Sequence, residues 1–396
     1  MNLIASSPDL GLSGANVLLA GLFRGLVGRG HQARWLITSH EENAEKAWLN
    51  DAGLDFQALP ATPVSAVRQR QELLVDAVCE MAPCVYFPNY DFDMLWAVGA
   101  FPSNCKTAFI IHCDDPIYYE AIDQRGHVMN AIICVSGYLA SEVKRRWPEH
   151  AERVHHIPFG VEWPVKNAIQ KPSLQNGPLE VVYCGRLAEE QKRIGDLAEI
   201  ILKCQNLPIR FHIAGSGPDE DAFFARLETP LKDGRVLRLG KLPHEQVSAL
   251  LERGHIFILT SAYEGLPVSL LEAMAHACVP VVSAVVSGIP EVIDEGINGF
   301  MLPIGDTAGF VRRLELLCGD ETALGAWAKA SQSTIERKGY ALCICLDRYL
   351  DLCFKLMESA SVAPAARKFR GLISPPRYRW SNRIQARFGW KVRAAS

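Results

Sequence analysis

Two glutamates, Glu264 and Glu272, stand eight residues apart in a segment that reads IFILTSAYEGLPVSLLE. An apolar run ends at Ser261, and Pro267 opens a helix at a position where its missing N–H costs nothing. Carboxylates accept hydrogen bonds from sugar or ribose hydroxyls, while the unpaired N–H groups of a first helical turn favour an anion. With a turn between them, both glutamates can face one site, so the segment predicts a ligand with hydroxyls and phosphate. The helix amides that point into the same space belong to Leu266, Val268 and Ser269.

Cations follow another apolar run. Val181–Gly185 leads into Arg186, and Lys192 and Arg193 come just before the next helical segment. A leaving nucleoside diphosphate gains negative charge as its bond breaks, and without a metal other groups must neutralise that charge. At about 4 Å and an effective dielectric near 20, each cation contributes roughly 4 kcal/mol before desolvation, which is ample for catalysis. For this segment alone, solvated basic residues beside two glutamates are the better interpretation.

Glycine-rich turns occur in both halves of the chain. Gly215 and Gly217 form a Gly-x-Gly-Pro turn, which by itself predicts only turn geometry. It lacks the further spacing of a dinucleotide fingerprint, so a nicotinamide enzyme is not predicted. In the first half, Gly11, Ser13 and Gly14 stand directly before a helical segment, where their loop would present amides across a cleft.

His112 ends the apolar run FIIHCDD, with Asp114 and Asp115 close behind it. A histidine there is either a satisfied core or rim residue or a group that reaches a ligand, and its place at a strand end adds weight to the second role. The other ten histidines, including His155 and His156, show no metal-ligand spacing. The 12 cysteines stand singly in apolar runs with no C-x-x-C, which predicts buried thiols in a reducing compartment.

Strands and helices alternate along most of the chain, which predicts parallel sheets covered on both faces. The predicted strands are Ala33–Thr38, Cys84–Pro88, Thr107–Cys113, Ala131–Ser136, Val181–Gly185, Arg210–Gly215, Val236–Gly240, Ile256–Ser261 and Val279–Ala284. The predicted helices are Asn16–Gly28, Ser65–Met81, Gly137–Trp147, Gly195–Cys204, His244–Arg253 and Val268–Ala277. Trp163–Pro178 is polar and lacks either period, which indicates a linker between two doubly wound domains. We expect a ligand in the cleft between the carboxyl ends of the two sets of strands.

Length and charge limit the classes of protein. The chain has 396 residues, which predicts two to three domains of roughly 150 residues. Hydrophobic residues make up 49% and charged residues 21%, which excludes collagen-like, low-complexity and wholly disordered proteins. A net charge of -3 excludes a protein that binds nucleic acid over its whole surface. Without a signal-peptide core or an apolar run near roughly 18 residues, we expect a cytoplasmic protein, soluble or peripheral on the inner face of the membrane.

The C-terminal region differs from the rest. Ala341–Met357 has the period of an amphipathic helix. Residues 363–396 carry nine basic residues, no acidic residue and five aromatic residues among the cations. This mixture suits an anionic membrane surface or an acidic partner, and a solvated terminus explains it equally well.

Together these motifs resemble family 4 of the retaining glycosyltransferases, the glycosyl transferases group 1. The motifs of the second half are, in order, Gly185-Arg186-Leu187 with Lys192, Gly215-x-Gly217-Pro218, Glu264-Gly265-Leu266-Pro267 leading to Glu272-Ala273-Met274-Ala275, SGIPEVI and NGFMLPIGD. In the first half, the Gly11–Gly14 loop, His112, Ser136 and HHIPFGVE resemble the family more loosely. The resemblance implies an α/β protein with the GT-B fold, two Rossmann-like doubly wound domains facing across a cleft and a C-terminal helix returning to the first. The implied units are an acceptor-side domain at 1–165, a donor domain at 166–340, a helix at 341–362 and the basic tail at 363–396.

The resemblance also implies roles for single residues. Arg186 and Lys192 would bind the diphosphate of the donor. Glu272 would bind the ribose hydroxyls and Glu264 the transferred sugar, with His112 near that sugar and the acceptor. Further donor contacts would come from Gly14, Gly185, Gly215, Gly217, Leu266, Val268 and Ser269.

The implied enzyme is a retaining hexosyltransferase of polysaccharide biosynthesis. It would move a sugar from a nucleotide sugar to a glycan or lipid-linked acceptor, with no metal or other cofactor and no nucleic-acid partner. Because no side chain is an obvious covalent nucleophile, front-face attack fits better than a double displacement between two carboxylates.

Two other functions keep the same architecture. A nucleotide-sugar epimerase needs the same diphosphate pocket and acts on the donor without an acceptor. A catalytically silent subunit of a polysaccharide assembly complex has no physical need for both cations and both carboxylates. Asp91-Phe92-Asp93 matches the metal-binding Asp-x-Asp of the other glycosyltransferase fold, but capping of a helix by Asp91 or Asp93 explains it without a metal.

Two positions depart from the family pattern. Arg193 stands where many relatives have glycine, and it either adds a phosphate contact or faces solvent. Ser287 stands where a second glycine is common. Base recognition is expected only in general terms, around Gly240–Leu242, and the sequence predicts neither the sugar nor the acceptor.

Overall fold

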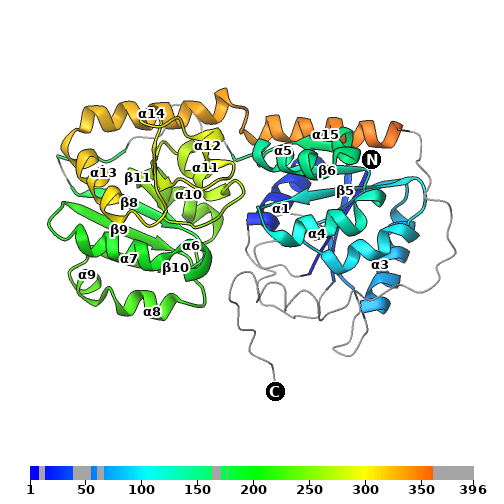
Figure 1. Ribbon diagram of the computed structural model, residues 1–396, viewed down its shortest axis with the longest axis horizontal. Helices are drawn as coiled ribbons and strands as arrows, with labels where there is room; N and C mark the ends of the chain where they lie inside the picture. The colour runs from blue at the N-terminus through cyan, green and yellow to red at the C-terminus, as the bar shows by residue number, and fades with distance from the viewer. Residues whose placement is uncertain (9–13, 39–54, 60–66, 163–170, 176, 360–396) are drawn as a thin grey trace, which may run out of the picture.

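The structure is a computed structural model that describes residues 1–8, 14–38, 55–59, 67–162, 171–175 and 177–359. Figure 1 shows two α/β bodies side by side, each built on its own sheet. The basic tail predicted at 363–396 and two residues of the N-terminal loop, Gly11 and Ser13, lie outside the described residues.

The first domain contains a seven-stranded sheet in the order β3-β2-β1-β4-β5-β6-β7, and its strand pairs are parallel. Its strands are β1 (Asn2–Ser7), β2 (Gln32–Ile37), β3 (Asp55–Ala58), β4 (Cys84–Pro88), β5 (Cys105–Ile111), β6 (Ala131–Cys134) and β7 (Val154–His156). Its α-helices are α1 (Gly14–Val27), α3 (Val67–Met81), α4 (Pro116–Arg125) and α5 (Gly137–Arg146). Three 3-10 helices join them: η2 (Phe92–Ala100), η3 (Gly126–Val128) and η4 (Pro148–Arg153).

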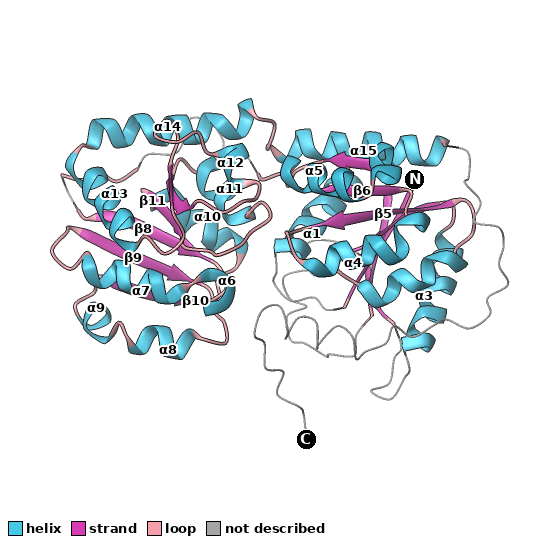
Figure 2. Ribbon diagram, in the orientation of Figure 1, coloured by secondary structure: helices cyan, strands magenta, loops and turns pink. Residues whose placement is uncertain are grey.

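The second domain contains a six-stranded parallel sheet in the order β10-β9-β8-β11-β12-β13. Its strands are β8 (Leu179–Cys184), β9 (Ile209–Ala214), β10 (Val236–Gly240), β11 (Ile256–Leu259), β12 (Val279–Ser283) and β13 (Phe300–Leu302). Its helices are α6 (Glu189–Lys192), α7 (Ile194–Lys203), α8 (Glu220–Ala225), α9 (Glu228–Lys232), α10 (His244–Arg253), α11 (Val268–Ala275), α12 (Ile289–Val292), α13 (Thr307–Gly319) and α14 (Glu321–Arg337). Figure 2 shows helices on both sides of each sheet.

The apolar runs of the sequence became parallel strands, as predicted, although the edge strand β10 buries only Val236. Every residue of β4, β5, β11 and β12 is buried, which is expected where helices cover both faces of a parallel sheet. Strand order reverses between β1 and β4 in the first sheet and between β8 and β11 in the second. Ligands of doubly wound sheets bind outside the carboxyl ends of the strands at such reversals, so the topology points to the loops after these four strands.

The last described helix, α15 (Leu342–Glu358), returns to the first domain and confirms that prediction. It contacts α1 and β4, and Figure 1 shows it beside the first domain in orange. Arg29, two residues after the end of α1, lies 2.6 Å from Asp347 of α15, and Val161 forms a parallel bridge with Ala341 where the chain crosses back. The GT-B architecture expected from the sequence is therefore present in full.

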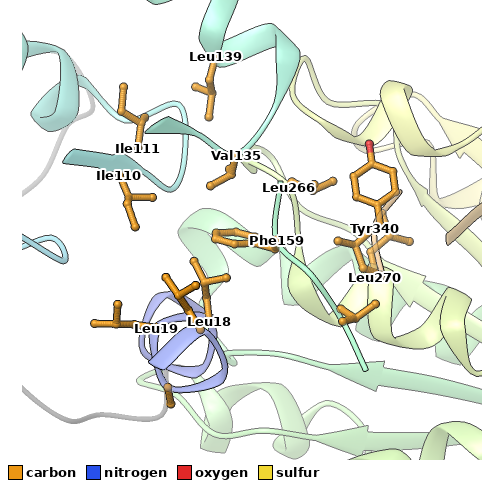
Figure 3. Close-up of a cluster of buried hydrophobic side chains, with 14 of the residues drawn as sticks. Leu18, Leu19, Ile110, Ile111, Val135, Leu139, Phe159, Leu266, Leu270 and Tyr340 are labelled. Carbon is orange, nitrogen blue, oxygen red and sulfur yellow. The ribbon is translucent and has the colours of Figure 1, made fainter. Parts of the chain in front are cut away.

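The two domains share buried apolar side chains where they meet. Figure 3 shows Phe159 lying among side chains of both domains, with Leu18 of α1 on one side and Leu266 and Leu270 on the other. All four side chains are less than 9% exposed. Burial of this kind favours one arrangement of the domains over separation.

The structure corrects one prediction in the first domain. Asp91 occupies the N-cap position of the 3-10 helix η2, but its side chain makes no cap hydrogen bond, and Asp93 lies within the first turn of the helix. Instead Thr38 Oγ1 donates to Asp91 Oδ2 at 2.8 Å, and Gln71 Nε2 donates to the carbonyl of Asp93. Burial is the main reason that the pKa of Asp91 rises to about 7.

All 12 cysteines are free thiols, and eight of them are buried. Among the described residues, no cluster of three or more His, Cys, Asp or Glu side chains is placed to bind a metal ion. Within the same described ranges, no helix combines the length and the apolar character needed to cross a membrane.

Candidate active site

The structure brings together a lysine and a glutamate that the sequence carries 72 positions apart. Lys192, the last residue of α6, places Nζ 2.5 Å from Oε1 of Glu264 in the loop after β11. Ser261 Oγ donates to the same carboxylate oxygen at 2.6 Å. The two charged side chains are only 13% and 7% exposed, so each is the other's main compensation for lost water. This pair sits at the carboxyl ends of β8 and β11, where the topology predicts a ligand.

Arg186, the second predicted cation, stands in the loop that follows β8. Its backbone is fixed, because Tyr183 Oη donates to the Arg186 carbonyl at 2.8 Å. Its side chain is exposed, and among the described residues its guanidinium forms no hydrogen bond or ion pair. The Arg186 guanidinium is therefore available to bind an anion at this loop.

The Arg193 side chain is 35% exposed and so partly faces solvent, while its contact with a phosphate stays a prediction. Its guanidinium is bound by Asp196, with Nε 2.6 Å from Oδ2. Its backbone is left-handed, with φ at 47°, between α6 and α7. A left-handed position costs an ordinary residue roughly 1–2 kcal/mol and costs glycine little, which explains why glycine suits this place.

Replacing Arg193 with glycine is expected to keep turnover within about twofold and the free energy of unfolding within about 1 kcal/mol. Relief of the left-handed strain offsets the lost ion pair and the extra freedom of glycine in the unfolded chain. Steady-state kinetics and denaturant unfolding of Arg193→Gly measure both quantities. A loss of turnover above tenfold would instead assign Arg193 to the phosphate.

The two predicted glycines after β9 hold that loop against the loop after β8. Leu187 N donates to the Ser216 carbonyl at 2.9 Å, and Gly185 N donates to the Ala214 carbonyl at 3.0 Å. Gly215 has φ at 138°. A Cβ on Gly217 would overlap the backbone carbonyl of Leu187. In this structure the glycines pack backbone against backbone and thereby support the loop that carries Arg186.

Gly217→Ala is expected to lower the free energy of unfolding by about 2 kcal/mol or more, because backbone atoms cannot yield as a flexible side chain does. Gly325→Ala in α14 is the control, since a Cβ there meets nothing within 4 Å. Urea denaturation compares the two variants. Equal free energies of unfolding for the two variants would show that the loops after β8 and β9 do not approach each other closely.

Glu272 lies in α11 with its carboxylate turned into the domain. Its side chain is 15% exposed, and Nδ1 of His244 is 3.5 Å from Oε1. Burial raises the pKa of Glu272 to about 7, and the negative charge of Glu162 adds to the effect. A buried carboxylate without a close cation lowers the stability of the folded protein. Hydrogen bonds from the hydroxyl groups of a ligand would compensate for that loss.

The N-terminus of α11 faces the first domain. The carbonyl of Pro267 accepts the helix's early hydrogen bonds from Leu270 and Leu271, so the N–H groups of Val268 and Ser269 precede that ladder. A Cβ on Gly14, the first residue of α1, would lie 3.7 Å from a methyl group of Val268. Gly14 is thus brought to this helix end, while Leu266 is 2% exposed and packs in the shared core.

His112 joins this group from the first domain. Residue Cys113 forms an antiparallel bridge with Gly265, so His112 and Glu264 lie on either side of one contact between the domains. The His112 ring stacks on Phe159, with ring centroids 5.7 Å apart and planes 18° apart. Both ring nitrogens are buried and lack a hydrogen-bond partner in the described part of the chain. Burial lowers the pKa of His112 to about 3, so the ring is neutral near pH 7.

Several contacts at the site were missed by the sequence reasoning. Ser261 hydrogen-bonds Glu264, Phe159 orients His112, and Glu162 and His244 set the surroundings of Glu272. Ser261 stood in the segment IFILTSAYEGLPVSLLE, and Phe159 and Glu162 stood in HHIPFGVE, but the sequence predicted no contact for any of them. The fold brings His244 to Glu272 from a predicted helix with no distinctive spacing.

A cavity of about 410 Å³ lies elsewhere in the second domain, between α10 and the strands β8, β9 and β10. Leu242 and Gln246 line its end near the predicted base-recognition segment, and Glu180, Arg210 and His212 line its floor. None of the predicted donor-binding residues lines this cavity.

Comparison with known proteins finds a family match within the second domain. Residues 178–320 match the model of the family described as "Glycosyl transferases group 1". The putative colanic acid biosynthesis glycosyltransferase WcaL of Salmonella typhimurium is 35% identical over 144 residues, which is 35% of this chain and 35% of WcaL. The lipopolysaccharide 1,6-galactosyltransferase of Escherichia coli K12 is 34% identical over 212 residues, which is 51% of this chain and 58% of that enzyme. The matches thus span between about a third and three fifths of these relatives.

Solved structures extend the likeness to the fold of the whole chain. The pneumococcal O-GlcNAc transferase GtfA, in complex with UDP and GlcNAc, superposes with a TM-score of 0.76 at 11% identity, over 91% of this chain and 99% of GtfA. At that identity the likeness concerns the fold. Residues 178–320 therefore carry the match to the glycosyl transferases group 1, and the chain as a whole has the GT-B fold.

Proposed function

We propose that this protein moves a hexosyl group from a nucleotide sugar to a glycan or lipid-linked acceptor, with retention of configuration and without a metal ion. The observation that carries the proposal is the buried Lys192–Glu264 pair, together with the uncommitted guanidinium of Arg186 in the loop after β8. These charges stand outside the carboxyl ends of β8 and β11, the place where a doubly wound domain binds a nucleotide. The named relatives, which include glycosyltransferases of polysaccharide and lipopolysaccharide synthesis, support transfer of a sugar.

The second domain supplies the donor contacts in this proposal. Arg186 and Lys192 neutralise the diphosphate, and the N–H groups of Val268 and Ser269 at the start of α11 add donors for an anion. The Glu272 carboxylate accepts hydrogen bonds from the ribose hydroxyls, which repay the cost of its burial. A UDP complex of the fold relative GtfA is in keeping with a nucleotide in such a domain.

In the proposed transfer step, the donor and the acceptor account for every bond and proton, so no cofactor is needed. The bond between the anomeric carbon and the β-phosphate oxygen breaks, and the acceptor oxygen forms its bond to the same face of that carbon. The acceptor's hydroxyl proton goes to the departing phosphate oxygen, and the products are a glycoside and a nucleoside diphosphate. Charge builds up on the phosphate as the bond breaks, which is where Arg186 and Lys192 stabilise the transition state more than the ground state.

The surroundings of Glu264 and His112 suit sugar binding. Lys192 and Ser261 both contact one oxygen of Glu264, which lowers the nucleophilicity of that carboxylate and favours direct front-face attack over a covalent intermediate. His112 stays neutral and carries two unpartnered buried nitrogens, so it offers one donor and one acceptor to a sugar hydroxyl.

Thermal-shift measurements with UDP-, GDP- and ADP-sugars identify the donor, because a bound donor raises the melting temperature. The same donor is then incubated with and without candidate acceptors in the presence of EDTA, and the product's anomeric configuration is read by NMR. We expect a glycoside with the donor's configuration, formed only with acceptor. Epimerised donor without acceptor, inverted product or loss of turnover in EDTA would each contradict a part of the proposal.

A further inference from the structure

Helix α5 of the first domain begins on a carboxylate that belongs to the second domain. Gly137 N donates to Oε2 of Glu291 at 2.9 Å, and Tyr138 N donates to Oε1 at 2.8 Å. The side chain of Ser136, in the helix's own domain, accepts the next hydrogen bond, from Leu139 N at 3.2 Å. Two of the N–H groups that every helix leaves unpaired at its start are therefore satisfied across the domain boundary.

The backbone of Glu291 is held within its own domain, whereas its carboxylate is directed to the other. Lys338 Nζ donates to the Glu291 carbonyl at 2.9 Å. Among the described residues, the hydrogen-bond partners of the carboxylate are both in α5, and Nε2 of His156, also in the first domain, is 3.8 Å from Oε2. In the described residues, the backbone of Glu291 is thus bonded within its own domain and its carboxylate to the first domain. We call this contact between Glu291 and α5 the clamp.

This contact is continuous with the candidate active site. Gly288, three residues before Glu291, donates its N–H to the Gly265 carbonyl at 2.7 Å. Gly265 in turn bridges Cys113, the neighbour of His112. A Cβ on Gly288 would lie 2.9 Å from Ser136 Cβ, so the two domains meet closely here. The position of Glu291 is thereby linked to the loop that carries Glu264.

We propose that Glu291 is a positioning residue, which holds the first domain in the arrangement that brings His112 over the donor-sugar residues. The kinetic consequence of this inference rests on the proposed glycosyl transfer. Its structural consequence rests on the contacts between Glu291 and α5. A carboxylate that receives two backbone N–H groups at a helix start is favoured by charge and by the helix dipole. Water replaces those bonds when the domains part, so the clamp biases the closed arrangement without locking it.

The test compares Glu291→Gln and Glu291→Ala with Glu295→Gln. Glu295 is a matched control, because it also accepts a backbone hydrogen bond, from Met301 N, but within its own domain. Hydrogen–deuterium exchange of the peptide that contains Gly137 and Tyr138 reports the clamp directly. Kinetics with the identified donor report its consequence.

We expect exchange at Gly137 and Tyr138 to be about tenfold faster in Glu291→Gln and faster still in Glu291→Ala, with the control unchanged. Turnover falls about tenfold in Glu291→Gln, while the donor KM stays within about twofold because the donor lies on the second domain. Unchanged exchange in both Glu291 variants overturns the clamp, and so does an equal loss of turnover in Glu295→Gln. If the wild-type protein transfers no sugar, the proposed function fails, and the exchange rates alone still decide the clamp.

Discussion

Arg186→Ala is expected to lower turnover on the order of a hundredfold or more while the free energy of unfolding changes by less than about 0.5 kcal/mol. Arg186 is exposed, and its guanidinium has no partner in the described structure. Its removal should therefore weaken the stabilisation of the phosphate without weakening the fold. Initial-rate kinetics at saturating donor and urea denaturation measure the two effects. Wild-type turnover in this variant would remove Arg186 from the phosphate site.

Lys192→Ala has a different expected outcome, although the sequence alone gave no reason to separate the two cations. Removing Lys192 leaves the carboxylate of Glu264, 7% exposed, without its cation, which costs about 3 kcal/mol of unfolding free energy in addition to turnover. The double variant Lys192→Ala/Glu264→Gln recovers the stability and not the turnover. Arg312→Ala, an exposed arginine on α13, serves as the control for both.

Glu272→Gln is expected to weaken nucleotide binding at least about tenfold and to stabilise the free protein at pH 8 by up to about 3 kcal/mol. In the proposed complex the Glu272 carboxylate accepts hydrogen bonds from ribose, so we expect the affinity to fall when an amide replaces it. The stability rises because the buried carboxylate, with its pKa raised to about 7, is held in the folded protein at a cost. A gain in stability with a loss of binding is the behaviour of a residue kept for its ligand.

The pH dependence of this stability effect has a definite sign. Between about pH 4.5 and 7, the folded protein keeps a proton on Glu272 that the unfolded chain has released, so wild-type stability falls as the pH rises through that window. The cost is complete above pH 7 and vanishes below pH 4.5. The advantage of Glu272→Gln should therefore be greatest at pH 8 and absent at pH 4.

Thermal unfolding from pH 4 to 8 and calorimetric titration with the nucleoside diphosphate measure both effects. Glu245→Gln, an exposed glutamate on the first turn of α10, is the matched control. Equal melting temperatures of wild type and Glu272→Gln at pH 8 would mean that the carboxylate is not buried at a cost. Equal affinity would mean that it does not touch the nucleotide.

Most of the fold could be predicted because its signals are local. Buried parallel strands appear as apolar runs, and β4, β10 and α10 have the bounds that the sequence predicts. Short elements such as β3 and β13 were missed, since three or four residues carry no period. The role of Asp91 was mistaken because its partner, Thr38, stands 53 residues earlier and leaves no mark near the aspartate.

The candidate site divides in the same way. The motifs around Arg186, Glu264 and Glu272 could be recognised because each is a short segment at a strand end. The Lys192–Glu264 pair, the left-handed backbone of Arg193 and the capping of α5 by Glu291 could not, because each depends on how distant segments pack. Sequence spacing identifies which residues can do chemistry, and long-range packing decides which partners they meet.

A crystal structure of the protein with its donor nucleotide sugar tests the central claim most directly. We expect both phosphates within hydrogen-bonding distance of Arg186 and Lys192, the ribose on Glu272 and no metal ion between the phosphates. A diphosphate bound away from these side chains, or held by a divalent cation, would contradict it.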